Sequence, residues 1–213
     1  MKDKKIIIIK LIINILIALL ELIGFVIIYK KYKLGLFIYY TECSNFLLLI
    51  SSCMIIFGLI NKLQGNKIKI KKKSIKLFNV FRFTACLSVF VTLLVVLTIL
   101  GPTYPTGYHG ILLSGSMLYH HTLCPILAII SFTFFEKYDF NTKDVIRSLY
   151  FTITYAIVLI SLNILDVVDG PYPFLRVQNQ SILTSMFYFL LIIGGTVILA
   201  FLFRLANRKL CIE

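Results

Sequence analysis

Six long apolar stretches dominate this chain of 213 residues, and each is long enough to cross a lipid bilayer as a helix. They cover residues 6–28, 34–59, 77–100, 111–135, 146–164 and 182–203. A transmembrane helix needs about 20 mostly apolar residues, whereas barrel strands alternate apolar and polar residues over roughly ten positions. Residues 93–100 are apolar except for Thr98 and show no such alternation, which favours helices. The sequence therefore predicts an all-α integral membrane protein, a bundle of six transmembrane helices forming a single domain over 1–213.

The lysines and arginines predict the orientation of the bundle. Fifteen of them lie in the N-terminal stub, the second and fourth loops and the C-terminal tail, and four (Lys30, Lys31, Lys33 and Arg176) lie in the other connections. Because positively charged short loops stay in the cytoplasm, both termini are predicted to be cytoplasmic in a cell membrane. Arg82 and Arg147 fall just inside helix ends on the basic side, so we expect them to reach out to lipid head groups as anchors.

The net charge of +13 does not indicate a nucleic-acid partner. Much of it lies in the run from Lys62 to Lys76, which is held between two predicted spans, so anionic lipid head groups are the expected partner. The same run also serves as a topology signal. No C-x-x-C, H-E-x-x-H, phosphate-binding loop or G-x-S-x-G motif occurs, so neither a cofactor nor a metal is expected.

Polar residues capable of chemistry interrupt three of the apolar stretches, where hydrocarbon makes them costly. They are Glu21, Thr41, Glu42, Ser44, Asn45, His120 and His121. At a rise of about 1.5 Å per residue, counting from the predicted outer ends places all of them roughly 10–16 Å deep. Thr41, Ser44 and Asn45 share one helical face, with Glu42 on its flank. These residues are predicted to line a cavity in the outer half of the membrane.

Such a cavity suits nucleophilic catalysis. A threonine hydroxyl attacks once a base removes its proton, and histidine is the usual base near neutral pH. Asn45 is a candidate donor to an oxyanion, and Glu21 and Glu42 are candidates to orient the imidazole. A structural interpretation exists for each residue: Thr41 and Ser44 can bond back to helix carbonyls, Asn45 can join two helices, and one histidine can donate to a carbonyl.

Three segments carry a resemblance to a known family. Residues 37–45 (F-I-Y-Y-T-E-C-S-N), 120–125 (H-H-T-L-C-P) and 170–175 (G-P-Y-P-F-L) resemble the threonine–histidine signature and Y-P-F loop of the androgen-induced-gene family and its bacterial six-helix relatives. The resemblance implies a membrane hydrolase of fatty acid esters of hydroxy fatty acids. It implies Thr41 as nucleophile and His120 or His121 as its partner, and the histidine-to-proline spacing of the bacterial relatives favours His121.

The sequence thus predicts an intramembrane lipid ester hydrolase that draws an amphiphilic ester from the outer leaflet. Acyl transfer on the same site, or a cysteine version using Cys43 or Cys124, is an alternative. Another is a transporter or ligand-binding membrane protein that binds protons or a cation through Glu21, Glu42 and the two histidines. A transporter needs polar residues that reach both faces of the membrane, whereas we expect them in the outer half only. A purely structural subunit is the remaining alternative.

Overall fold

The computed structural model describes residues 2–66 and 71–212, and the regular elements in these ranges are helical. Six helical segments are long and apolar enough to span a membrane, which confirms the predicted class of multi-pass membrane protein. They are Lys4–Ile38, Tyr40–Leu63, Lys72–Thr103, Leu118–Phe135, Thr142–Ile164 and Ile182–Leu210. The basic run from Lys62 to Lys76 includes residues 67–70, which lie outside the described residues, so its expected lipid contact is not addressed by the structure.

The spans are built from α-helices joined to shorter 3₁₀ and π segments, both of which are labelled η. In chain order the elements are α1 (Lys2–Tyr32), η1 (Lys33–Ile38), α2 (Tyr40–Leu63), α3 (Lys72–Val95), η2 (Val96–Leu100), η3 (Gly101–Thr103), α4 (Gly107–Leu113), η4 (Leu118–Leu123), α5 (Cys124–Ile130), η5 (Ser131–Phe135), α6 (Thr142–Ser148), α7 (Tyr150–Ile164), η6 (Pro173–Leu175), η7 (Val177–Asn179) and α8 (Ile182–Leu210).

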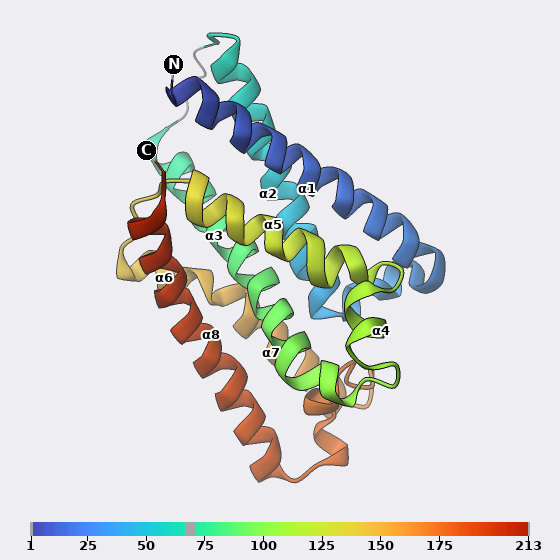
Figure 1. The fold of residues 1–213 in the computed structure, drawn as a ribbon. Coiled ribbons are helices and arrows are strands. Elements are labelled where there is room, and N and C mark those ends of the chain that lie inside the picture. The colour runs from blue at the N-terminus through green and yellow to red at the C-terminus, as the bar shows by residue number, and fades with distance from the viewer. Residues whose placement is uncertain (1, 67–70, 213) are drawn as a thin grey trace.

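Helix α3 occupies the middle of the bundle, where it contacts α2, α5, α6, α7 and α8. Helix α1 packs along α2 and along the segment from η4 to η5, and both chain termini lie at the same end of the bundle (Figure 1). The buried residues of α8 all belong to its second half, beginning at Thr196. The first half of α8 therefore packs loosely against the bundle and presents apolar side chains to the surrounding lipid.

An arginine at the termini end joins three helices to the segment that follows η5. Arg82 is fully buried, and each of its five N–H groups has an acceptor. Its Nε and Nη2 atoms donate to Glu136 at 3.1 and 2.8 Å, and Nη2 also donates to Asn14 at 3.0 Å. Its Nη1 atom donates to Ser51 and Ser52, both at 3.0 Å. One side chain thereby ties α1, α2 and α3 together.

Glu136 accepts hydrogen bonds on both carboxylate oxygens. Besides the bonds from Arg82, it receives bonds from the hydroxyls of Ser131 at 2.6 Å and Tyr138 at 2.8 Å. Burial by itself would raise the pKa of Glu136, but Arg82, together with Lys10, outweighs burial and holds that pKa at about 2. The carboxylate is therefore charged at neutral pH, and the buried pair is ionic.

Two expectations from the sequence are wrong at this end of the bundle. Arg82 does not reach out to head groups, because its partners lie inside the bundle. Arg147 is half exposed, as an anchor would be, although it also pairs with Asp144 at 3.3 Å. The expectation that buried polar residues gather in the outer half only is also wrong, because the Arg82–Glu136 network lies at the opposite end from the histidines.

The fourth apolar stretch is not one helix over 111–135. Helix α4 ends at Leu113, and a turn in which Gly115 has a φ of +55° separates it from η4, so the span begins at Leu118. Glycine adopts this left-handed conformation without the steric cost that other residues carry. The second span likewise begins at Tyr40 rather than at residue 34. Thr41 and the histidines therefore lie within the first turn of their spans.

We expect Arg82→Leu to lower the free energy of unfolding by about 3–5 kcal/mol, because it leaves Glu136 buried without a counter-charge. Thermal unfolding in dodecyl maltoside micelles measures the change. Arg147→Leu is the matched control, with an expected loss within about 1 kcal/mol because the arginine is exposed. Replacing Arg82 and Glu136 together by leucine should recover much of the loss. Equal losses for Arg82→Leu and Arg147→Leu would contradict this assignment.

Candidate functional site

The first turn of α2 presents Thr41 with its carbonyl group fully engaged. Ser44 Oγ and Asn45 Nδ2 both donate to the Thr41 carbonyl oxygen at 2.8 Å. The second Asn45 N–H donates to the carbonyl of His120 at 3.1 Å, and the Ser44 hydroxyl also lies 3.2 Å from that of Thr92. Ser44 thus bonds back to a carbonyl of its own helix, and Asn45 joins α2 to η4. Both contacts agree with the structural roles considered for these residues from the sequence.

The amide of Asn45 does not fit the role of oxyanion donor. Both of its N–H groups are already bonded to carbonyl oxygens, and its Oδ1 atom is buried without a partner. An oxygen acceptor repels an oxyanion, so a different donor is needed.

The hydroxyl of Thr41 faces a tyrosine from the last loop. Tyr172 Oη lies 3.5 Å from Thr41 Oγ1 and accepts a 3.4 Å hydrogen bond from the Thr41 backbone N–H. The Thr41 side chain makes no bond back to a helix carbonyl within the described residues, unlike Ser44. Its hydroxyl is therefore the member of this turn that is available for chemistry.

The two adjacent histidines have different surroundings, although both belong to the π segment η4. His121 Nδ1 lies 2.7 Å from the carbonyl oxygen of Ile111 in α4. Because a carbonyl oxygen only accepts, Nδ1 carries the proton and Nε2 of the neutral ring carries the lone pair. A neighbouring bond from Thr122 to the carbonyl of Leu112, also 2.7 Å, holds the same turn. His121 is thus fixed in the tautomer that a general base at Nε2 requires.

His120 lies between two carboxylates. Its Nδ1 atom is 2.7 Å from Glu42 Oε2 and its Nε2 atom is 3.4 Å from Glu21 Oε2. Neither contact has the alignment of a hydrogen bond, and both carboxylate oxygens of Glu21 are buried without a hydrogen-bond partner. His120 Nε2 also lies 3.5 Å from the backbone carbonyl oxygen of Glu21. Phe25 packs on the imidazole with 4.7 Å between ring centroids. His120 therefore links α1 and α2, because it contacts Glu21 of α1 and Glu42 of α2.

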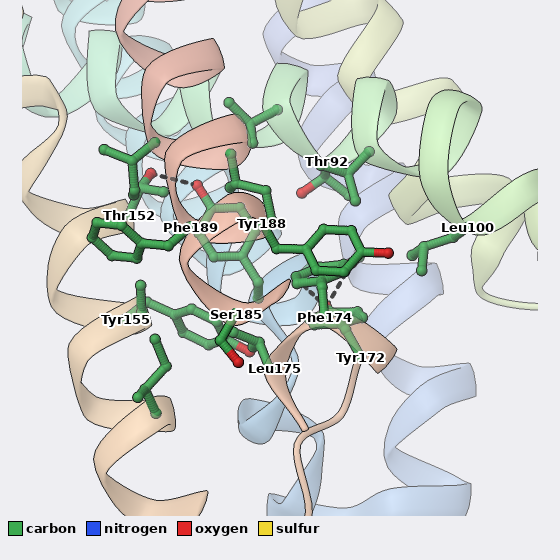
Figure 2. A pocket seen from close by; sticks show the side chains of 18 of the residues that line it. Thr92, Leu100, Thr152, Tyr155, Tyr172, Phe174, Leu175, Ser185, Tyr188 and Phe189 are labelled. Atoms are coloured by element: carbon green, nitrogen blue, oxygen red, sulfur yellow. Dashed lines mark hydrogen bonds between the residues drawn. The ribbon is translucent and has the colours of Figure 1, made fainter. Parts of the chain in front are cut away.

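Two cavities meet at Thr41. The apolar cavity, about 80 Å³, lies among α3, α7, α8 and the loop carrying η6, and aliphatic and aromatic side chains such as Tyr155, Phe174 and Tyr188 surround it (Figure 2). The polar cavity, about 360 Å³, includes Glu42 and His121 in its wall. Thr41, Leu100 and Tyr172 belong to both walls. The nucleophile candidate therefore stands at the boundary between an apolar and a polar compartment.

The structure thus gathers four of the candidates around Thr41 and separates two others from it. Glu42 and His121 share the polar cavity with Thr41, and Ser44 and Asn45 hold its carbonyl. His120 and Glu21 lie behind Glu42 and line neither cavity.

Tyr172 is the residue that sequence reasoning missed. Its Y-P-F loop served as a sign of family resemblance, but a loop distant in the sequence gives no signal that its hydroxyl returns to Thr41.

Within the described residues, no three His, Cys, Asp or Glu side chains are arranged to hold a metal ion. A search of protein-family models, curated proteins and solved structures finds no match to this chain. The site must therefore be interpreted from its own geometry.

We expect Gly24→Ala to displace His120, because a methyl group at this α1 position would overlap the imidazole Nε2 atom, far inside van der Waals contact. The helix must separate or the ring must turn away from Glu21, so the thermal midpoint should fall. Gly58→Ala is the matched control, since a methyl group there meets no atom within 4 Å. It should leave the midpoint unchanged or raise it slightly, because alanine favours helix. A Gly24→Ala protein as stable as Gly58→Ala would contradict the tight contact.

Proposed function

We propose that this protein is an intramembrane hydrolase of lipid esters, with Thr41 as nucleophile and His121 as base. The observation that carries the proposal is the position of the Thr41 hydroxyl, on the wall between an apolar cavity and the polar cavity that holds His121. An ester of a fatty acid has the same division, because its carbonyl carbon separates a hydrocarbon chain from a more polar alcohol. The resemblance of the Thr41, His121 and Tyr172 segments to the androgen-induced-gene family points the same way.

The reaction would run in two steps on this geometry. His121 Nε2 takes the proton of Thr41, and the oxygen attacks the ester carbonyl carbon, whose π electrons move to the carbonyl oxygen. When the intermediate collapses, the C–O bond to the alcohol breaks and His121 returns the proton to the leaving oxygen. Water, deprotonated by His121, then attacks the carbonyl carbon of the acyl-threonine. The C–O bond to Thr41 breaks, His121 returns the proton to the Thr41 oxygen, and the fatty acid is released. If a lipid alcohol replaces this water, the same site performs acyl transfer.

His121 suits the role of base better than His120. Its lone pair is on Nε2, its ring lines the cavity of Thr41, and the Ile111 carbonyl stabilises the imidazolium that forms. His120 is enclosed by Glu21, Glu42 and Phe25, and its carbonyl is engaged by Asn45. We therefore assign His120 a supporting role, in which it holds the Glu42 carboxylate at the edge of the polar cavity.

Tyr172 suits the role of oxyanion donor. Its oxygen accepts the Thr41 N–H, which leaves its own proton free to donate, and that proton lies next to the attacking Thr41 oxygen. A developing oxyanion forms on the atom bonded to the carbon that Thr41 attacks, so it falls within reach of this hydroxyl. The aromatic ring itself stacks on Phe174 at 5.2 Å between centroids, which fixes the position of the hydroxyl.

The loose first half of α8 supports entry of the substrate from the bilayer. The apolar cavity is bordered there by α8 residues including Phe189, which is 40% exposed. An acyl chain could pass between α7 and α8 without leaving hydrocarbon. We further propose that the site faces the outer leaflet of the cell membrane and that both termini are cytoplasmic, on the distribution of lysine and arginine.

A proton-coupled transporter is the second candidate, favoured by the unpartnered Glu21 carboxylate and by the Arg82 network at the other end of α1. Two features count against it. Ile17, fully buried, lies between Asn14 and Glu21 on α1, and the donors of Arg82 are all occupied. A path for protons would have to cross an apolar layer there.

We expect a fluorophosphonate probe to label Thr41 in protein purified in dodecyl maltoside, because an activated hydroxyl attacks phosphorus as it attacks a carbonyl carbon. Thr41→Ala should remove the label and His121→Ala should slow labelling by about 100-fold or more, the scale of general base catalysis. Mass spectrometry of the labelled peptide gives the site.

Thr98→Ala and His109→Ala, at exposed positions, are the controls and should label at the rate of the unmodified protein. No labelling together with no cleavage of a lipid ester library would refute the hydrolase proposal. Dependence on His120 rather than His121 would refute the assignment of the base.

We expect Tyr172→Phe to reduce ester cleavage by about 100-fold or more, since loss of one oxyanion donor typically costs this much. The thermal midpoint should barely change, because the lost hydrogen bonds are long. Tyr188→Phe is the matched control, a tyrosine that lines the same apolar cavity and makes no hydrogen bond in the described structure. Equal activities for the two variants would show that the Tyr172 hydroxyl takes no part in the reaction.

A further inference from the structure

The polar cavity is rich in tyrosine and contains one acidic group. Tyr32, Tyr39, Tyr104 and Tyr172 line it, Glu42 supplies the carboxylate, and neither lysine nor arginine is among its lining residues, all of which are described. This wall differs from one that binds a carboxylate or a phosphate, which typically supplies arginine, lysine or several N–H donors.

The tyrosine rings are set at steep angles to one another. Tyr32 and Tyr39 lie 5.4 Å apart between centroids with 66° between their planes, and Tyr39 and Tyr172 lie 6.3 Å apart with 77° between theirs. All four tyrosines line the same cavity. Walls of this kind attract organic cations, because the face of each ring is electron-rich.

The charges around the cavity favour a cation as well. Glu42 is the acidic residue among the lining residues, and the imidazole of His120 behind it carries a charge only when protonated. The Ile111 carbonyl binds His121 at Nδ1, so the neutral ring has its lone pair on Nε2. The ammonium group of Lys31 already lies over the Tyr32 ring, 4.9 Å from its centroid, but its side chain is exposed and belongs to the surface.

We propose that the polar cavity binds a quaternary ammonium head group. The tyrosine rings would contact its methyl groups and Glu42 would provide the opposite charge. The use of this cavity in a reaction depends on the proposed function: the head group would then belong to the alcohol that leaves, and the acyl chain would lie in the apolar cavity. An anionic alcohol, such as a hydroxy fatty acid, would be disfavoured by Glu42 and by the absence of a cation from the wall.

Choline and its neutral isostere 3,3-dimethyl-1-butanol test the proposal, since they share a shape and differ in charge. Each is titrated into the protein in dodecyl maltoside micelles and followed by isothermal titration calorimetry, with 3-hydroxy-3-methylbutyrate as the anion. We expect saturable binding of choline, at least about tenfold tighter than that of the isostere, and no binding of the anion. Choline that binds no tighter than its isostere would overturn the proposal.

Variants locate the binding. Glu42→Gln and Tyr104→Leu should each weaken choline binding by about tenfold, and Tyr104→Leu serves as the test if Glu42→Gln does not fold. Tyr150→Leu, on an exposed face of α7, is the control and should bind as the unmodified protein does. Unchanged affinity in Tyr104→Leu would place the cation elsewhere and overturn the proposal.

Choline binding and fluorophosphonate labelling, both measured on the unmodified protein, separate this proposal from the hydrolase proposal. If Thr41 is labelled but the protein does not bind choline, the hydrolase proposal stands and the head-group site is refuted. If the protein binds choline but Thr41 is not labelled, the head-group site stands and the hydrolase proposal is refuted.

Discussion

The fully bonded guanidinium of Arg82 is the interaction on which the rest of the structure depends. In hydrocarbon no water can satisfy an unpaired donor, so each of its five N–H groups requires a protein acceptor. Those acceptors come from α1, α2 and the segment after η5, and they can be brought together in few ways. Asn207 of α8 binds the carbonyls of Phe132 and Glu136, which adds the last helix to the same arrangement.

The two ends of the bundle are therefore built differently. At the termini end, Phe83, Phe132, Phe140 and Phe203 stack closely beside the Arg82 network. At the other end, cavities separate the helices, and buried acceptors such as those of the Glu21 carboxylate lack hydrogen-bond partners. A rigid anchor at one end allows the other to tolerate these features, which are common where proteins bind ligands.

The sequence predicts the class and the spans well, because the cost of exposing a peptide group to lipid makes long apolar helices the available solution. It predicts contacts between helices poorly. Hydropathy placed Arg82 just inside a helix end, whereas α3 begins ten residues earlier, at Lys72. It also gave no sign that Glu136, 54 residues later, would meet Arg82 inside the bundle. Likewise the break at Gly115 is invisible to a hydropathy count, and it places the histidines in the first turn of their span.

In the candidate site, too, the sequence predicts which residues take part but not how they contact one another. Thr41, Glu42 and the histidines were identified from their cost in hydrocarbon, and they do lie close together. Which groups remain available for chemistry could not be predicted, because this depends on partners from other elements. Both N–H groups of Asn45 donate to carbonyl oxygens, whereas the hydroxyl of Thr41 contacts that of Tyr172. The two histidines are adjacent in sequence, and the surrounding helices distinguish them. His120 lies against the carboxylate of Glu42, whereas His121 bonds to the Ile111 carbonyl and is the base candidate.

The proton on His121 is held by the main chain of α4 and by no side chain. The carbonyls of Ile111 and Leu112 are free because α4 ends there, and the last carbonyls of any helix lack partners within it. The tautomer of this histidine is therefore insensitive to which amino acids α4 carries. It is sensitive to where α4 ends, so the constraint falls on the turn at Gly115, a position without any functional group.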